Sequence, residues 1–117
     1  MAYNWDDAKR RMAVDDDVWE ELIAQDDKWG VQDHPDVHEE DPEYDRKVYG
    51  IWADRWKGAN AGRVERRSLA WDGILLEEVY EALAESDEGR LYAELIQVAA
   101  VAQQWAEAIL RRQDRDV

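Results

Sequence analysis

Apolar side chains recur along this chain at the three- and four-residue spacing of amphipathic α-helices. No stretch alternates convincingly with the two-residue period of a β-strand. The helical pattern covers residues 15–29 and 44–56, then a segment from Ser68 or Asp72 to about Glu85, and a last one from 86–88 to about Arg112. The pattern predicts an all-α fold, a helical bundle of about four helices.

The segments between the expected helices have loop composition. Residues 30–43 combine Gly30 with both prolines of the chain, and residues 58–67 contain two glycines and three arginines, which predicts a flexible basic turn. Residues 1–14 carry a weaker helical pattern and either extend the first helix or form an arm. The aspartates at 15–17 are candidate N-cap residues for that helix. A chain of 117 residues fits one small domain, so we expect a single domain over residues 1–117.

Acidic residues outnumber basic ones so strongly that the formal net charge is −14. This charge disfavours binding to nucleic acids or anionic membranes, because phosphate contacts need a cationic surface. The absence of cysteine excludes disulfides and thiolate metal sites. No apolar run approaches the length of a membrane span, and we expect a cytoplasmic protein.

The last predicted helix is apolar on more than one side. Between Leu95 and Ala102 every residue except Gln97 is apolar. A chain this short can hardly cover such a helix by itself, so we expect homo-oligomers, either dimers or tetramers, that complete the core.

Several glutamates border the apolar faces of the last two predicted helices. At about 100° per residue, Glu78, Glu81 and Glu85 lie beside the apolar stripe of their helix, whereas Glu77 points farther round toward solvent. Glu94 has the same border position on the next helix. Carboxylates that face one another are costly unless they are protonated or bridged by a cation. Either Glu78, Glu81 and Glu94 bind Mg²⁺ or Mn²⁺, or these glutamates only fringe two amphipathic helices of a very acidic protein.

The same residues resemble a known sequence signature. The strings 71-WDGILLEEVYE-81 and 94-ELIQ-97 are similar to the Glu-Glu-x-x-Glu and Glu-x-x-Asp motifs of MazG-like members of the all-α nucleoside triphosphate pyrophosphohydrolase superfamily. The loop 28-KWGVQDHP-35 is similar to the loop after the first helix in bacterial and phage members. Gln97 departs from the pattern, because the family has an aspartate at that position.

The resemblance implies Mg²⁺-dependent hydrolysis of a nucleotide between its α and β phosphates, with release of a monophosphate and pyrophosphate. It implies that Glu77, Glu78 and Glu81 are catalytic. It further implies a metal site formed by Glu78, Glu81, Glu94 and Gln97, where the glutamine offers a neutral oxygen and lowers the charge that holds the cation.

Substrate contacts are expected from two other segments. The basic island includes Lys57, Arg63 and Arg67, which could contact phosphates, although any one of them could instead pair with the acidic first helix. Trp29, Gln32 and His34 are the candidates for base recognition. The alternative to an enzyme is a catalytically weak or inactive member that uses its acidic surface to bind a basic partner, as a nucleic-acid mimic does. Residues 1–45, with a net charge of −12, favour this alternative.

Overall fold

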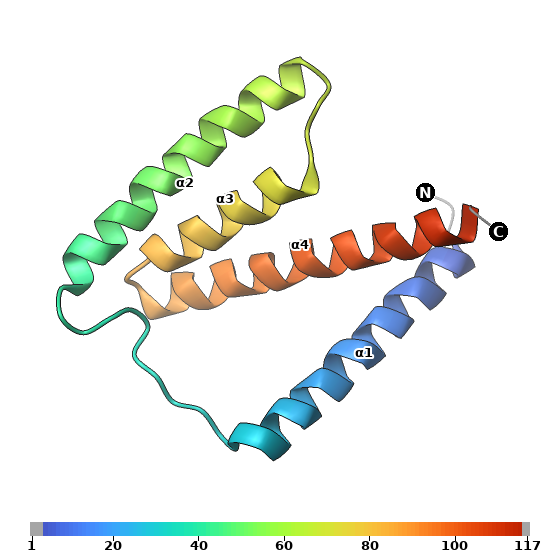
Figure 1. The fold of residues 1–117 in the computed structure, drawn as a ribbon, viewed down its shortest axis with the longest axis horizontal. Coiled ribbons are helices and arrows are strands. Elements are labelled where there is room, and N and C mark those ends of the chain that lie inside the picture. The colour runs from blue at the N-terminus through green and yellow to red at the C-terminus, as the bar shows by residue number, and fades with distance from the viewer. Residues whose placement is uncertain (1–3, 116–117) are drawn as a thin grey trace. The chain divides into compact units, whose positions relative to one another are not determined.

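A computed structural model describes residues 4–115, and this part of the chain is all-α, with four helices and no strand (Figure 1). The helices are α1 (Trp5–Trp29), α2 (Pro42–Glu65), α3 (Trp71–Ala84) and α4 (Glu88–Arg115). The predicted all-α class is therefore confirmed. The chain forms two compact units: one contains the described parts of Met1–His34 and Gln103–Val117, and the other contains Pro35–Ala102.

Short polar side chains begin three of the helices. Asn4 Oδ1 accepts hydrogen bonds from the backbone N–H groups of Asp6 and Asp7, Asp41 caps α2 through Tyr44, and Asp87 caps α4 through Arg90. These caps satisfy N–H groups that have no partner within a helix. The expectation that the aspartates at 15–17 cap the first helix is wrong, because α1 already begins at Trp5. Residues 5–14 extend this helix, and residues 1–3 of the expected arm lie outside the described residues.

The predicted turn over residues 58–67 is also wrong in its first part. α2 continues through Gly58 and Gly62 to Glu65, and the chain turns only at residues 66–70. Within this turn Arg67 adopts a left-handed backbone conformation with a φ of 55°. A glycine inside a helix costs about 1 kcal/mol relative to alanine, which is why the sequence favoured a turn. Contacts between the end of α2 and α3 offset this cost.

One of these contacts involves the buried side chain of Asn60. Its Nδ2 donates hydrogen bonds of 2.9 Å to the carbonyl oxygen of Gly73 and to Glu77 Oε1, both on α3. A Cβ atom on residue 73 would lie only 2.3 Å from Asn60 Oδ1, so the two helices can approach this closely only because residue 73 is glycine. Nearby, Arg63 donates to Asp72 at 2.8 Å, and this hydrogen bond is the main reason why the pKa of Asp72 is lowered.

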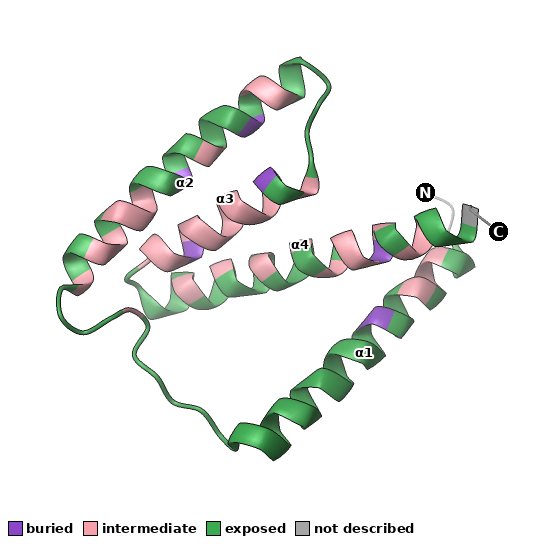
Figure 2. Ribbon diagram, in the orientation of Figure 1, coloured by how far each residue is buried: buried purple, intermediate pink, exposed green. Residues whose placement is uncertain are grey.

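α2 and α3 run antiparallel, side by side, in Figure 1. At the far end of the pair, a Cβ atom on Gly50 would meet Ala84 Cβ at 3.8 Å, which is ordinary van der Waals contact. Between the two ends, the ring of Tyr80 stacks against Tyr49 and Trp52 with centroid distances of 6.3 and 6.2 Å. Most of α3 is consequently half-buried (Figure 2). These contacts fix the register between α2 and α3.

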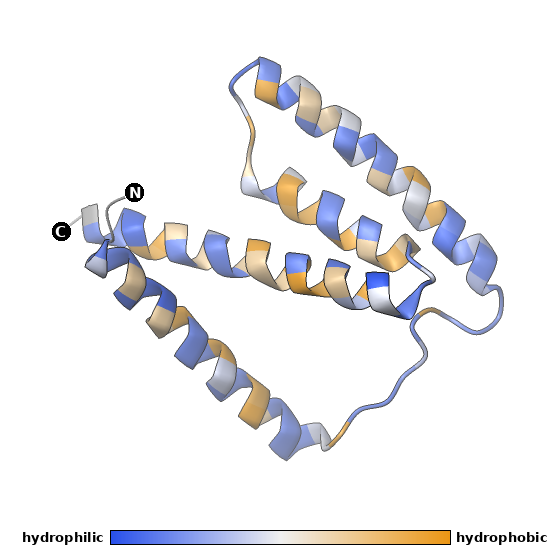
Figure 3. Cartoon of the chain, turned by 180° about the vertical axis from the view of Figure 1, so that it is seen from behind, coloured by the Kyte–Doolittle hydropathy of each residue, from blue (hydrophilic) through white to orange (hydrophobic). Residues whose placement is uncertain are grey.

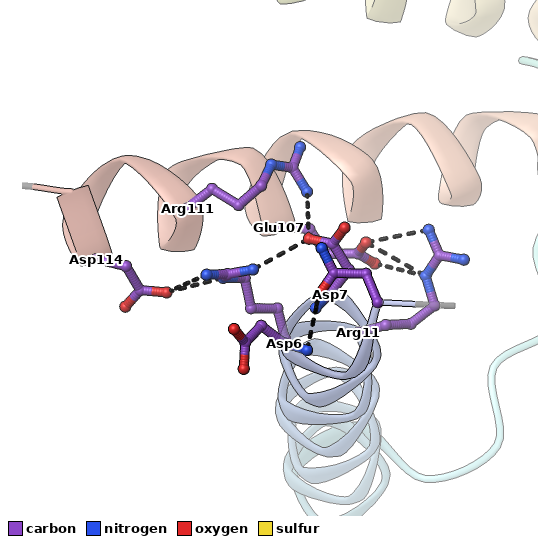
Figure 4. Close-up of polar contacts among 8 residues, drawn as sticks. Asp6, Asp7, Arg11, Glu107, Arg111 and Asp114 are labelled. Atoms are coloured by element: carbon purple, nitrogen blue, oxygen red, sulfur yellow. Dashed lines mark hydrogen bonds and ion pairs between the residues drawn. The ribbon is translucent and has the colours of Figure 1, made fainter. Parts of the chain in front are cut away.

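In the other unit, ion pairs join the start of α1 to the end of α4 (Figure 4). Arg11 donates from Nε and Nη2 to the carboxylate of Glu107, which is only 3% exposed. Arg10 forms a second pair with Asp114 at 2.6 Å. The hydrogen bond from Arg11 is the main cause that lowers the pKa of Glu107. The buried carboxylate of Glu107 is tolerated here because the Arg11 guanidinium donates hydrogen bonds to both of its oxygens.

Many apolar side chains remain at the surface. Every residue from 15 to 29 of α1 is exposed, and on α4 Tyr92, Leu95 and Ile96 are exposed as well. Figure 3 shows apolar and polar residues mixed along each helix. None of the helices in the described part of the chain is both long and apolar enough to cross a membrane.

Replacement of Gly73 by alanine tests the contact between α2 and α3. Gly73→Ala is expected to lower the free energy of unfolding by about 1–3 kcal/mol, because the new methyl group overlaps the Asn60 amide. Gly58→Ala is the matched control, since a Cβ atom there meets nothing within 4 Å. The control should stabilise the protein by about 0.5–1 kcal/mol. Urea unfolding followed by circular dichroism measures both, and equal effects of the two substitutions would contradict the assignment.

Candidate metal centre

Three glutamates of the second unit converge on one point. Glu78 and Glu81 lie one turn apart on α3, and Glu94 lies on α4 after the short turn that follows Ala84. Each offers a carboxylate oxygen, and these atoms all lie within 4.8 Å of one another. All three residues are half-buried. The sequence analysis named these three residues together, and the structure brings them together.

The environment of the cluster disfavours negative charge. Burial, followed by the charge of Glu78 and of the other glutamates around it, raises the pKa of Glu81 to about 7. Burial also raises the pKa of Glu78, with the charges of Glu94 and Glu77 acting in the same direction. One oxygen of Glu78 and one of Glu94, both Oε2, are buried without a hydrogen-bond partner. Protonation or a bound cation would relieve the penalty on the charges of Glu78 and Glu81.

A hard divalent cation fits these residues. Carboxylate oxygens are the donors that Mg²⁺ and Mn²⁺ prefer, and the two buried oxygens without a partner are available to a cation. A cation would also offset the burial penalty and the repulsion that together raise the pKa values of Glu78 and Glu81. The geometry thus supports a possible acidic metal site at Glu78, Glu81 and Glu94, and it does not distinguish between metals.

Glu77 does not face solvent as its helical position predicted. The residue is half-buried, its Oε1 accepts the hydrogen bond from Asn60, and its carboxyl group also shares a hydrogen bond with Glu81. The prediction failed because α2 covers this side of α3 at Asn60. Glu77 is consequently a neighbour of the cluster, held in position from α2.

Gln97 follows Glu94 by three residues on α4, and its side chain is exposed. Glu94 itself is half-buried. A role for Gln97 as a ligand stays a prediction.

The residues expected to bind phosphate lie along α2 and in the turn after it. Arg63 is engaged by Asp72 and also lies over the ring of Trp56, 5.4 Å from its centroid. Its partner is thus on α3 and not on the acidic first helix. Lys57 is exposed, and Arg67 is exposed in the turn between α2 and α3.

The residues expected to recognise a base belong to the other unit. Trp29 is 61% exposed at the end of α1, with Lys28 Nζ 4.8 Å from its ring centroid. Gln32 and His34 are exposed and contact each other, with 3.2 Å between Gln32 Oε1 and His34 Nε2. The substrate roles of these three residues stay predictions.

A cavity of about 540 Å³ opens beside the glutamate cluster. Its wall on α2 consists of side chains at helical spacing, and its opposite wall includes two of the three clustered glutamates. The lining residues are Lys47, Gly50, Ile51, Ala53, Asp54, Glu81, Ala84, Glu85 and Glu94. A volume of this size is in the range of small-molecule sites.

The α2 wall of this cavity and the role of Asn60 were not predicted from the sequence. Lys47, Gly50, Ile51 and Asp54 have the spacing of one helix face within the helix predicted over residues 44–56, but the sequence did not reveal that this face lies against α3. For Asn60, the sequence signal was its position. It follows Ala53 and Trp56 at steps of three and four residues, so it lies on the same face of the helix as these two residues.

Comparison of the chain with protein-family models, with curated proteins and with solved structures finds no match in any of the three.

The raised pKa of Glu81 predicts how stability depends on pH without metal. Its ordinary pKa is 4.5, so the folded state binds this proton more tightly than the unfolded state does. The resulting contribution to stability is complete below pH 4.5 and is lost as the pH rises through about 7. In EDTA, the Tm should fall over this window, and Glu81→Gln should flatten the decrease. Differential scanning fluorimetry at pH 5 to 8 measures it.

Glu85→Gln is the matched control, because Glu85 is half-buried directly after the end of α3 and is not one of the three clustered residues. Glu85→Gln should keep the wild-type dependence of Tm on pH.

At pH 8, Mn²⁺ should raise the Tm of the wild type and of Glu85→Gln, and it should raise the Tm of Glu81→Gln much less. Gln97→Asp should increase the Mn²⁺ affinity if residue 97 is a ligand. A wild-type Tm that does not change when Mn²⁺ is added would contradict a metal site.

Proposed function

We propose that this protein is a MazG-like nucleotide pyrophosphohydrolase that depends on Mg²⁺, with Mn²⁺ as a substitute. The observation that carries the proposal is the convergence of Glu78, Glu81 and Glu94 within 4.8 Å, with two buried oxygens that lack a partner. These residues occupy positions of the two motifs that resemble the family signature. The all-α fold is consistent with that resemblance.

The proposed reaction consumes one water molecule. The water oxygen forms a bond to the α-phosphorus of a nucleoside triphosphate or a related nucleotide. The bond from that phosphorus to the oxygen that bridges it to the β-phosphorus breaks, and pyrophosphate leaves with the bridging oxygen. The products are a nucleoside monophosphate, pyrophosphate and the proton that water loses.

Each acidic residue has a stated task in this proposal. Glu78, Glu81 and Glu94 hold the cation, and Gln97 offers a further neutral oxygen. When bound, the cation neutralises phosphate oxygens and activates water. Glu77 orients the water, while Asn60 holds its Oε1 in place.

The proposal includes a homodimer or tetramer. Leu95 and Ile96 are 51% and 54% exposed on α4, and Tyr92 is exposed one turn before Ile96. Helix-on-helix contact with a second copy would remove this apolar area from water. The same face therefore supports self-association close to Glu94.

Hydrolysis assays on the purified full chain test the enzyme. With Mg²⁺ or Mn²⁺, at least one member of a panel of canonical, modified and signalling nucleotides should release monophosphate and pyrophosphate. Glu78→Gln and Glu81→Gln should each lower kcat by about a hundredfold or more, because each removes a charged metal ligand. Glu85→Gln should retain most of the activity.

Two outcomes would count against the proposal in different ways. Full turnover by Glu81→Gln would show that the site is wrong while the activity exists. A folded wild type that releases no product from any nucleotide would contradict the activity itself.

The second outcome would favour an acidic interaction protein. α1 carries exposed carboxylates at residues 15–17, 20, 21, 26 and 27, together with exposed Trp19 and Trp29. An acidic face with interspersed aromatic residues suits a basic partner protein.

Self-association has its own test. The wild type should sediment as a dimer or tetramer, and Ile96→Glu should sediment as a monomer, because a charge at the centre of an apolar contact is not compensated. Gln113→Glu adds the same charge at an exposed position near the end of α4 and should leave the assembly unchanged. Sedimentation velocity distinguishes these states, and a monomeric wild type would contradict the oligomer.

A further inference from the structure

The cavity beside the glutamate cluster contains one cationic side chain among four carboxylates. Lys47 is that cation, and Asp54, Glu81, Glu85 and Glu94 are the acids. An anion alone would be repelled from such a surface. A ligand that fits the cavity must therefore bring positive charge with it, or must bind after a cation has neutralised the cluster.

The register between α2 and α3 places Lys47 at one end of this cavity. Asn60 contacts Gly73 and Gly50 lies beside Ala84, so residues near 53 and 54 of α2 lie level with Glu81. Lys47 is seven residues from Asp54, which corresponds to roughly 10 Å along the helix axis at 1.5 Å per residue. A lysine side chain and a chain of two or three phosphates together bridge such a distance.

Apolar residues contribute to the wall of this cavity. Gly50, Ile51 and Ala84 line it together with Glu85, and the side chains of these residues offer no hydrogen-bond donor that would compete with Lys47. Lys47 is exposed, and its ammonium group is a compact point charge with three donors, as phosphate oxygens require.

From this geometry we propose that Lys47 binds the terminal phosphates of a metal-bound nucleotide, the part that leaves as pyrophosphate. The inference rests on the proposed function for the identity of the nucleotide. For the cavity itself, the inference concerns only the pyrophosphate group and not the rest of the nucleotide. This group is held at one end by the cation of the glutamate cluster and at the other end by Lys47. This assignment replaces Lys57, Arg63 and Arg67 as the main phosphate contacts, because none of the three lines the cavity and Arg63 is engaged by Asp72.

Inorganic pyrophosphate is the probe that tests Lys47 without any turnover. Isothermal titration calorimetry on the full chain with Mn²⁺ present should give a pyrophosphate affinity that falls about tenfold in Lys47→Gln, the loss expected for one charged phosphate contact. Lys47→Arg keeps the charge and should stay within about threefold of the wild type. The Mn²⁺ affinity in the absence of pyrophosphate should be the same in all three proteins.

Lys57→Gln is the matched control. It removes the same charge from an exposed position of the same helix, ten residues farther along and outside the cavity lining. Its pyrophosphate affinity should equal that of the wild type. Equal losses in Lys57→Gln and Lys47→Gln would overturn the proposal, because they would reflect net charge and not a contact.

The outcomes separate the inference from the proposed function. Hydrolysis of a nucleotide with no effect of Lys47→Gln on pyrophosphate affinity would overturn the inference and leave the enzyme in place. Pyrophosphate binding that depends on Lys47, in a protein without hydrolytic activity, would support the site and contradict the enzyme. A wild type that binds no pyrophosphate in the presence of Mn²⁺ would overturn the inference outright.

Discussion

The close approach of α2 and α3 at Gly73 is the constraint on which the second unit depends. The Asn60 amide fits against the α3 backbone only where no Cβ atom is present, and this fit, together with the stacking of Tyr80, fixes the register of the two helices. The register then determines which side chains of α2 lie opposite Glu81. It also places Gly50 beside Ala84 and sets the length of the cavity between α2 and α3. The same amide holds Glu77, which in turn contacts Glu81. A contact that stabilises the helix pair thus also positions the acidic cluster.

The cluster itself works against folding. Glu78 and Glu81 both have raised pKa values because burial and neighbouring carboxylates penalise their charge. In the other unit the chain handles a buried carboxylate differently, since Arg11 pairs with Glu107 and lowers its pKa. The charge of Glu107 is therefore compensated by an arginine of the same chain. The charges of the glutamate cluster have no such partner, and a proton or a cation would have to neutralise them. Uncompensated buried charge that reduces stability is typical of functional sites.

The helical class and the glutamate cluster were predictable because they follow from short-range spacing. Glu78 and Glu81 share a face by their three-residue separation, and Glu94 takes the equivalent position one helix later. The errors arose where packing overrides local preference. Gly58 and Gly62 suggested a turn, yet Asn60 between them anchors the helix to α3. Glu77 was placed in solvent because its own helix could not reveal that α2 covers that side. Lys47 is one of many charged residues until the register with α3 is known.

The two units also differ in how their parts are distributed along the chain. The second unit is one continuous segment, Pro35–Ala102, whereas the first joins the two ends of the sequence, with Arg11 and Glu107 separated by 96 residues. Contacts within a hairpin of neighbouring helices form readily, while contacts between distant residues must first overcome the entropy of closing a long loop. During synthesis, the segment Pro35–Ala102 leaves the ribosome before the last part of α4 does. The sequence separation of these contacts therefore favours a folding order in which the segment with the candidate site forms first and the ion-paired ends form last.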